Sequence, residues 1–243
     1  MARYAPKNNI RRLLFRLGGV RVGPFSKIAR RVFLEPGVSI NDHTLILQNA
    51  RIEAGAIIGK SCIIQQGVSI ESQVEIGNNV VIGQNAVLRN CTIGDNTSIE
   101  YGVVCAGDNK NRISIGRFCY IGIYTVLDNT GGIEIGDGVH IAGPAAGIWT
   151  HSSVFQCLAG DRIENPQKKV VASVIINNNV WIGGGTTIYP GVKVEHHSVI
   201  LSNSCVNKDI PSFSMAGGVP VQIKKRIRIN GAEISFTADR DER

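Results

Sequence analysis

The residue of this chain best placed to do chemistry is a histidine at position 151. The stretch 147-GIWTHSSVFQ-156 brings Trp149, Thr150 and His151 together where an otherwise regular repeat stops. A neutral imidazole has a pKa of about 6.5 and removes a proton from a hydroxyl group efficiently near neutral pH. His151 is therefore a candidate general base, and the alternative is an ordinary structural or exposed histidine.

A histidine base works best when an acid or a carbonyl group holds its second ring nitrogen. The sequence offers four acidic candidates and does not choose among them: Asp128, Glu134, Asp161 and Glu164. The other histidines fall at corner positions of the repeat or inside a regular repeat unit: His43, His140, His196 and His197.

Around His151 the chain repeats an aliphatic residue at every sixth position. From Val22 to Leu88 each step of six is Val, Ile or Leu, and four residues after each stands a small or β-branched residue. One residue is then dropped, and the repeat resumes at Ile93 and continues with interruptions to Val206. A period of six is neither helical nor a simple alternation. It predicts short strands joined by tight corners, stacked about 4.8 Å apart around a continuous core.

This [Ile/Leu/Val]-[Gly/Ala/Glu/Asp]-x-x-[small]-x pattern resembles the hexapeptide-repeat acyltransferases over residues from about 22 to 225. The resemblance implies an all-β fold, a left-handed parallel β-helix with three hexads per triangular coil. We expect a basic N-terminal cap segment at 1–21 with a short helix, and the acyltransferase β-helix at 22–225. An extruded loop is expected at 151–174 and a C-terminal tail, as a peripheral strand or a disordered segment, at 226–243.

Three interruptions break the repeat, and loops on a rigid scaffold commonly carry function. They are 105-CAGDNKNRIS-114, 128-DNTGGIE-134 and the long segment from His151 to about Val174. Loops as long as the third are uncommon in a compact domain unless they are functional.

A narrower resemblance concerns the galactoside and maltose O-acetyltransferase-like branch of that family. The segments 136-GDGVHIA-142, 150-TH-151 and 178-NNVWIGGG-185 match its pattern. By this similarity His151 is the general base of acetyl transfer from acetyl-CoA to a sugar hydroxyl. The branch often carries an Asn before the His element, and here 121-IGIYTVLDN-129 departs from that pattern. The candidate acceptor-binding residues are Tyr124, Asp128, Asn129 and Trp149.

The same resemblance implies a donor site for coenzyme A after the loop. The segments 181-WIGGGTTIYPGVKV-194 and 200-ILSNSCVNKDIPSFSMAGGVPVQIKKR-226 carry it. The implied cofactor-binding residues are Trp181, Gly184, Ser202, Asn207, Lys208, Gly217, Gly218, Pro220 and Lys225. A basic run at 224–226 suits the coenzyme's phosphates, although a basic C-terminal segment can also be simply solvated.

Composition and charge limit the other classes of function. No apolar run reaches the roughly 18 residues of a transmembrane helix, and we expect no signal peptide. The six cysteines form no CxxC pair or zinc pattern, so we expect no metal and a reducing cytoplasm. Residues 1–31 hold nine Lys or Arg and no acid. They predict a cap on the core, or peripheral contact with an anionic membrane or an acidic polymer, and not nucleic-acid binding.

The leading hypothesis is an acetyl-CoA-dependent O-acetyltransferase of a sugar or surface-glycan unit, from capsule or lipopolysaccharide. Transfer would be direct, in a ternary complex, because no Cys or Ser stands paired with a base. The family implies a homotrimer with active sites between subunits. The alternatives are an N-acetyltransferase of an amino-sugar nucleotide and a non-catalytic trimeric binding scaffold. A carbonic-anhydrase-like enzyme is disfavoured because it needs clustered His ligands.

Overall fold

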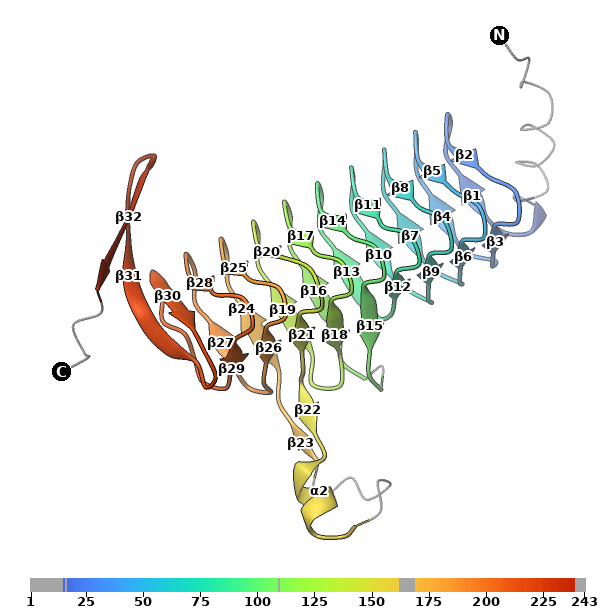
Figure 1. Cartoon of the computed structure of the whole chain (residues 1–243). Coiled ribbons are helices and arrows are strands. Elements are labelled where there is room, and N and C mark those ends of the chain that lie inside the picture. Colours follow the sequence, from blue (N-terminus) through green and yellow to red (C-terminus); the bar gives the residue numbers. More distant parts are fainter. Residues whose placement is uncertain (1–14, 16, 109, 162–168, 239–243) are drawn as a thin grey trace.

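The chain winds into a left-handed parallel β-helix whose coils stack along one axis (Figure 1). The computed structural model describes residues 15, 17–108, 110–161 and 169–238. Each coil contributes one short strand to each of three flat sheets, here named faces A, B and C. The fold class expected from the six-residue repeat is confirmed. The basic N-terminal cap segment lies mostly outside the described residues.

The strands of each face lie side by side in coil order. Face A contains β1 (Arg21–Val22), β4 (Ser39–Ile40), β7 (Ile57–Ile58), β10 (Glu75–Ile76), β13 (Cys91–Ile93), β16 (Ile113–Ile115), β19 (Ile133–Ile135), β24 (Val174–Ile176) and β27 (Lys193–Val194). Face B contains β2 (Lys27–Ile28), β5 (Leu45–Ile46), β8 (Ile63–Ile64), β11 (Val81–Ile82), β14 (Ser98–Ile99), β17 (Tyr120–Ile121), β20 (His140–Ile141), β25 (Trp181–Ile182), β28 (Val199–Ile200), β30 (Ser214–Gly217), β31 (Gln222–Asn230) and β32 (Glu233–Ala238). Face C contains β3 (Phe33–Leu34), β6 (Arg51–Ile52), β9 (Ser69–Ile70), β12 (Val87–Leu88), β15 (Val104–Ala106), β18 (Val126–Asp128), β21 (Gly147–Ile148), β26 (Thr187–Ile188) and β29 (Cys205–Val206).

The aliphatic residue of each repeat points into the core. Ile40, Ile46 and Ile52, one on each face, are at most 1% exposed. Successive coils are in register, so that Ile40 lies opposite Ile58 in the next coil. Burying each such side chain contributes about 1.5–3 kcal/mol relative to leaving it in water. The repeat therefore specifies both the direction of each side chain and the register of the coils.

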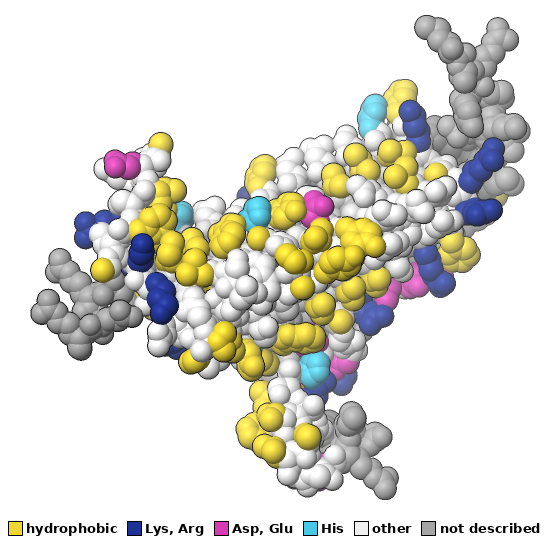
Figure 2. All heavy atoms as spheres, in the orientation of Figure 1, with side chains coloured by type: hydrophobic (Ala, Val, Ile, Leu, Met, Phe, Trp, Pro, Cys, Tyr) yellow, Lys and Arg dark blue, Asp and Glu magenta, His cyan; other side chains and the backbone are white. Residues whose placement is uncertain are grey.

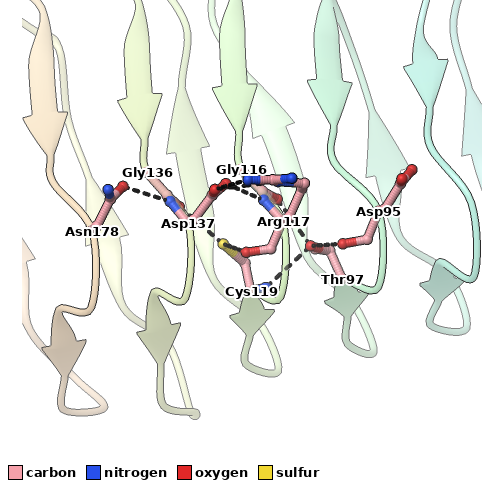
Figure 3. A network of polar contacts seen from close by, with 8 residues as sticks. All are labelled: Asp95, Thr97, Gly116, Arg117, Cys119, Gly136, Asp137 and Asn178. Atoms are coloured by element: carbon pink, nitrogen blue, oxygen red, sulfur yellow. Dashed lines mark hydrogen bonds and ion pairs between the residues drawn. The ribbon is translucent and has the colours of Figure 1, made fainter.

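Polar side chains link neighbouring coils at the corner that leads from face A to face B (Figure 3). The Asp137 carboxylate accepts a hydrogen bond from the Arg117 backbone N–H at 2.7 Å and pairs with the Arg117 guanidinium at 2.8 Å. Inside the same corner, the Thr97 hydroxyl donates to the Gly116 carbonyl at 2.9 Å and accepts from the Cys119 N–H at 3.1 Å. These contacts satisfy backbone groups that the corner would otherwise leave buried without partners.

All three interruptions of the repeat fall at one corner, the corner from face C to face A, in three consecutive coils. They join β15 to β16, β18 to β19 and β21 to β24. The third projects as an arm, seen below the coils in Figure 1. It begins with an antiparallel ribbon of β22 (His151–Ser152) and β23 (Val170–Val171) and carries the short helix α2 (Val154–Leu158). The expected long loop is therefore partly regular, and residues 162–168 lie outside the described part.

At the C-terminal end the chain reverses direction and forms a hairpin of β31 and β32. This hairpin pairs antiparallel with β30 and extends face B. The expected boundary between residues 225 and 226 falls inside β31, so the β-helix and the tail share one strand. Cross-strand pairs such as Ile227 with Phe236 and Ile229 with Ile234 explain the continuation, because apolar residues opposite each other stabilise a hairpin.

Replacing Thr97 by Val should lower the free energy of unfolding by about 1–3 kcal/mol, because the buried Cys119 N–H would lose its acceptor. Chemical denaturation monitored by circular dichroism measures the effect. The matched control is Thr92→Val, since the Thr92 hydroxyl makes only an exposed contact with Ser114, and it should change stability by less than about 0.5 kcal/mol. Equal effects of the two substitutions would contradict a structural role for the Thr97 hydroxyl.

Candidate active site

The candidate site is built by two residues from consecutive coils, Asp128 and His151. Nδ1 of His151 lies 2.6 Å from Oδ2 of Asp128. The Asp128 side chain is 1% exposed, whereas that of His151 is 32% exposed. Asp128 ends β18 on face C, and His151 opens β22 at the base of the arm. Of the four acidic candidates, Asp128 is the one that meets the imidazole; Glu164 lies outside the described residues.

Two threonines also hold the Asp128 carboxylate. The hydroxyl of Thr130 donates to Oδ1 at 2.7 Å, and the backbone N–H of Thr150 donates to Oδ2 at 2.9 Å. The Thr150 hydroxyl also bonds the Asp128 carbonyl at 2.7 Å and accepts from the Gly131 N–H at 2.7 Å. The carboxylate and its neighbours are therefore fixed before any substrate arrives.

Burial alone would raise the pKa of Asp128. The hydrogen bonds from Thr130, Thr150 and His151 outweigh burial and hold the pKa below its ordinary value. An ionised carboxylate only accepts hydrogen bonds, so Nδ1 of His151 carries the proton and donates it toward Asp128. Nε2, on the other side of the ring, is the acceptor nitrogen of a neutral imidazole in this tautomer. An imidazole held in this way can act as a general base.

The other predicted acceptor-binding residues separate into two groups. Trp149 is two residues before His151 and is 39% exposed, so it lies at the same edge as the histidine. Asn129 is completely buried, and its backbone N–H donates to the Ala106 carbonyl at 2.7 Å. Tyr124 lies across face C, at the corner from face B to face C, with its ring 5.2 Å from that of Tyr101.

The predicted donor-binding residues lie mostly on the other side of face C from His151. Gly184, Ser202, Gly218 and Pro220 stand at or beside the corner from face B to face C, and Gly217 ends β30 there. Trp181 lies on face B with its ring 6.4 Å from that of His140, and Lys225 of β31 pairs with Met215 of β30. Asn207 and Lys208 follow β29 at the corner on the His151 side. Most of the donor residues of a chain thus lie at a different corner from its His151, and Asn207 and Lys208 are the exceptions.

Thr150, which belongs to the Thr-His element of the sequence, and two residues that the sequence analysis did not single out, Gly107 and Thr130, complete the site. Thr130 and Thr150 clamp the carboxylate, and Gly107 allows close packing, since a Cβ there would stand 2.2 Å from Oδ1 of Asn129. The sequence held one signal that could have located these residues. The interruptions of the repeat recur at one corner, which places 107, 128–132 and 150–151 at one edge.

Among the described residues, no group of three or more His, Cys, Asp or Glu side chains is arranged to hold a metal ion.

The comparisons with known proteins identify the family to which the repeat belongs. The family described as bacterial transferase hexapeptide (six repeats) matches residues 55–90 and 73–107. The Saccharomyces cerevisiae protein YJL218W, named for an inferred acetyltransferase activity, is 36% identical over 145 residues, which are 58% of this chain and 67% of that protein. Galactoside O-acetyltransferase of Escherichia coli is 33% identical over 141 residues, 56% of this chain and 64% of that enzyme.

A solved structure shares the fold over most of its length. The UDP-N-acetylglucosamine acyltransferase of Campylobacter jejuni superposes with a TM-score of 0.69 at 22% identity, covering 82% of this chain and 75% of that one. Together, the repeat, the β-helix and the relatives show that the chain belongs to the hexapeptide-repeat acyltransferase family.

The lowered pKa of Asp128 predicts an acid-sensitive contribution to stability. The ionised form of Asp128 is favoured in the folded state. Its contribution to the free energy of unfolding is therefore fully present above the unfolded-state pKa of about 3.9, and it is lost as pH falls through the lower folded-state pKa. Asp128→Asn should therefore cost about 2 kcal/mol at pH 7, and the gap to wild type should narrow below about pH 4.

Denaturant unfolding of both proteins at pH 7, 5 and 3 measures this gap. The control is Asp108→Asn, because the contacts of Asp108 are exposed: an ion pair with the Lys110 ammonium at 3.8 Å and a hydrogen bond from the Lys110 backbone N–H at 3.3 Å. A gap for Asp128→Asn that stays constant with pH would show that the folded-state pKa is not lowered.

Proposed function

We propose that this chain is an acetyl-CoA-dependent O-acetyltransferase that acetylates a hydroxyl of a sugar, as part of a surface glycan such as capsule or lipopolysaccharide. The observation that carries the proposal is the pair of Asp128 and His151, with Nδ1 held at 2.6 Å and Nε2 directed away from the carboxylate. Galactoside O-acetyltransferase among the relatives supports a sugar hydroxyl as the acceptor.

In this proposal His151 is the general base and Asp128 orients it. Nε2 takes the proton of the acceptor hydroxyl while its oxygen attacks the thioester carbonyl of acetyl-CoA. The tetrahedral oxyanion then collapses, the carbon–sulfur bond breaks, and the thiolate leaves and takes the proton from His151. The buried Asp128 carboxylate stabilises the transient imidazolium, and backbone N–H groups at the coil edge supply donors to the oxyanion. No acyl-enzyme is formed.

The donor is proposed to bind along the glycine-rich corner of an adjacent subunit in a homotrimer. The separation of Gly184, Ser202 and Gly218 from His151 across face C supports a site shared by two chains. The arm supplies exposed apolar surface for such a contact, as Figure 2 shows: Val154, Phe155 and Leu158 are 47%, 58% and 79% exposed. Burying such residues against a second chain is favourable.

The cations at the C-terminal end suit the phosphates of coenzyme A. Lys208, Lys224 and Lys225 are exposed there, and ammonium groups bind phosphate as point charges.

We propose a cytoplasmic location, where acetyl-CoA is made. The six cysteines are all free thiols in the structure, which fits a reducing compartment. No helix in the described part is long and apolar enough to cross a membrane.

Removing the base should abolish turnover while leaving the donor site intact. His151→Ala is expected to lower kcat by about 10²- to 10⁴-fold and to leave the Kd for acetyl-CoA unchanged, because the imidazole acts on the acceptor. Thiol release during turnover and calorimetric titration with acetyl-CoA measure the two quantities. His43→Ala, on a remote N-terminal coil, is the control and should keep wild-type turnover. Wild-type rates in His151→Ala would contradict the role of His151.

The chemistry of the product distinguishes O-acetylation from N-acetylation. The protein is incubated with labelled acetyl-CoA and a panel of neutral pyranosides and amino-sugar nucleotides, and the products are treated with mild alkali or hydroxylamine. We expect the label to be released, because esters hydrolyse and amides persist. Label that survives this treatment would favour the amino-sugar alternative. The absence of acetyl-CoA binding would favour a non-catalytic scaffold.

A further inference from the structure

The strand leading into the arm presents alternating buried and exposed residues. Ile148 is 1% exposed and Thr150 is fully buried, whereas Trp149 is 39% exposed and the His151 side chain is 32% exposed. Side chains alternate along an extended strand, so Gly147, Trp149 and His151 form one outward row. An indole and the proposed base therefore project on the same side, two residues apart.

The first residue of this row is a glycine, and the indole of Trp149 lies over it. A Cβ added at Gly147 would stand 2.7 Å from Nε1 and 3.3 Å from Cε2 of Trp149. These distances are too short for any side chain at 147 to coexist with the observed indole position. Gly147 is flanked on face C by Val126 of the preceding coil and Thr187 of the following one. The missing side chain thus makes a shallow seat between two coils in which the indole rests.

From these observations we propose that Trp149, seated on Gly147, is an acceptor subsite that stacks against the apolar face of a pyranose ring and presents one hydroxyl of that ring to Nε2 of His151. The inference rests on the proposed sugar O-acetyltransferase function and deepens it. It assigns to Gly147 the positioning of the indole and to Trp149 the preference for a cyclic sugar over an open-chain alcohol.

The chemistry of the two partners supports this assignment. A pyranose ring has a C–H face that is apolar and a rim of hydroxyls that is polar, and an indole offers a large rigid apolar face. Positions 149 and 151 are about 7 Å apart along an extended strand. Because the indole lies back over Gly147, the proposal requires a sugar that extends from the indole along the strand toward His151 and presents a rim hydroxyl there. The glycine-rich corner proposed for the donor lies across face C, so the donor does not need Trp149 from the same chain.

The test starts from the pyranoside that wild type acetylates best in a panel of methyl pyranosides, compared with sorbitol as an open-chain polyol. Trp149→Ala should raise KM for the pyranoside by about tenfold or more, with little change for sorbitol. KM for acetyl-CoA and the mass of the oligomer by light scattering should stay the same. Trp149→Phe should recover part of the loss, because a smaller aromatic face remains.

A double-mutant cycle tests the seat. Gly147→Ala alone should raise KM for the pyranoside because the new methyl group displaces the indole. In the Trp149→Ala background the same substitution should have no further effect, since there is no indole to displace. Additive effects of Gly147→Ala and Trp149→Ala would overturn the role assigned to Gly147.

A binding measurement separates failure of this inference from failure of the proposed function. The chain has two tryptophans, so Trp181→Phe leaves Trp149 as the single fluorophore, and its emission should change on titration with methyl pyranosides. If wild type acetylates sugars but Trp149→Ala leaves the pyranoside KM and the preference over sorbitol unchanged, the inference is wrong and the function stands. Loss of the oligomer in Trp149→Ala would also overturn it, by showing that the indole packs against another subunit. If the pyranosides are neither acetylated nor bound, both proposals fail.

Discussion

The hydrogen-bonded stacking of coils in register is the interaction on which the rest of this structure depends. A strand of two residues has too few hydrogen bonds to be stable alone, so each coil is ordered only by the coils on either side. In-register stacking places the same position of successive repeats in one column, as in the pairing of Ile40 with Ile58 and of Ile58 with Ile76. Inward positions must then hold aliphatic side chains of similar size, and a change of length is tolerated only at a corner.

The placement of the site follows from this constraint. Extra residues at the corner from face C to face A lengthen the chain without disturbing the columns, and three consecutive coils use that corner. Asp128 comes from one of these coils and Thr150 with His151 from the next, so the usual spacing of about 4.8 Å between coils sets the distance over which carboxylate and imidazole meet. The stacked coils thereby supply the preorganisation of the carboxylate and the imidazole.

The sequence predicted the architecture well because the aliphatic period is a direct record of the buried columns. It also predicted that the segment at His151 leaves the coil. It could not choose Asp128 over Glu134 or Asp161, because the choice depends on which corner residue points inward, and a single carboxylate at 128 gives no periodic signal. The contacts of Thr130 and Thr150 with the carboxylate could not be predicted for the same reason, since Thr is also a common small residue of the repeat. For 226–243 the sequence left a peripheral strand and a disordered segment open, because the hairpin abandons the period of six for an ordinary alternation around Ile227 and Ile229.

The reversal of chain direction at the C-terminal end has a consequence for solubility. A parallel ladder of coils ends in open backbone donors and acceptors, which could template the addition of another molecule and so start a fibre. In face B the last parallel strand, β30, is instead covered by an antiparallel hairpin, in which Arg226 and Arg228 alternate with apolar residues. A further coil in the parallel sense finds no matching register there. The hairpin thus ends a repeat that has no intrinsic limit to its length and keeps the enzyme a discrete particle.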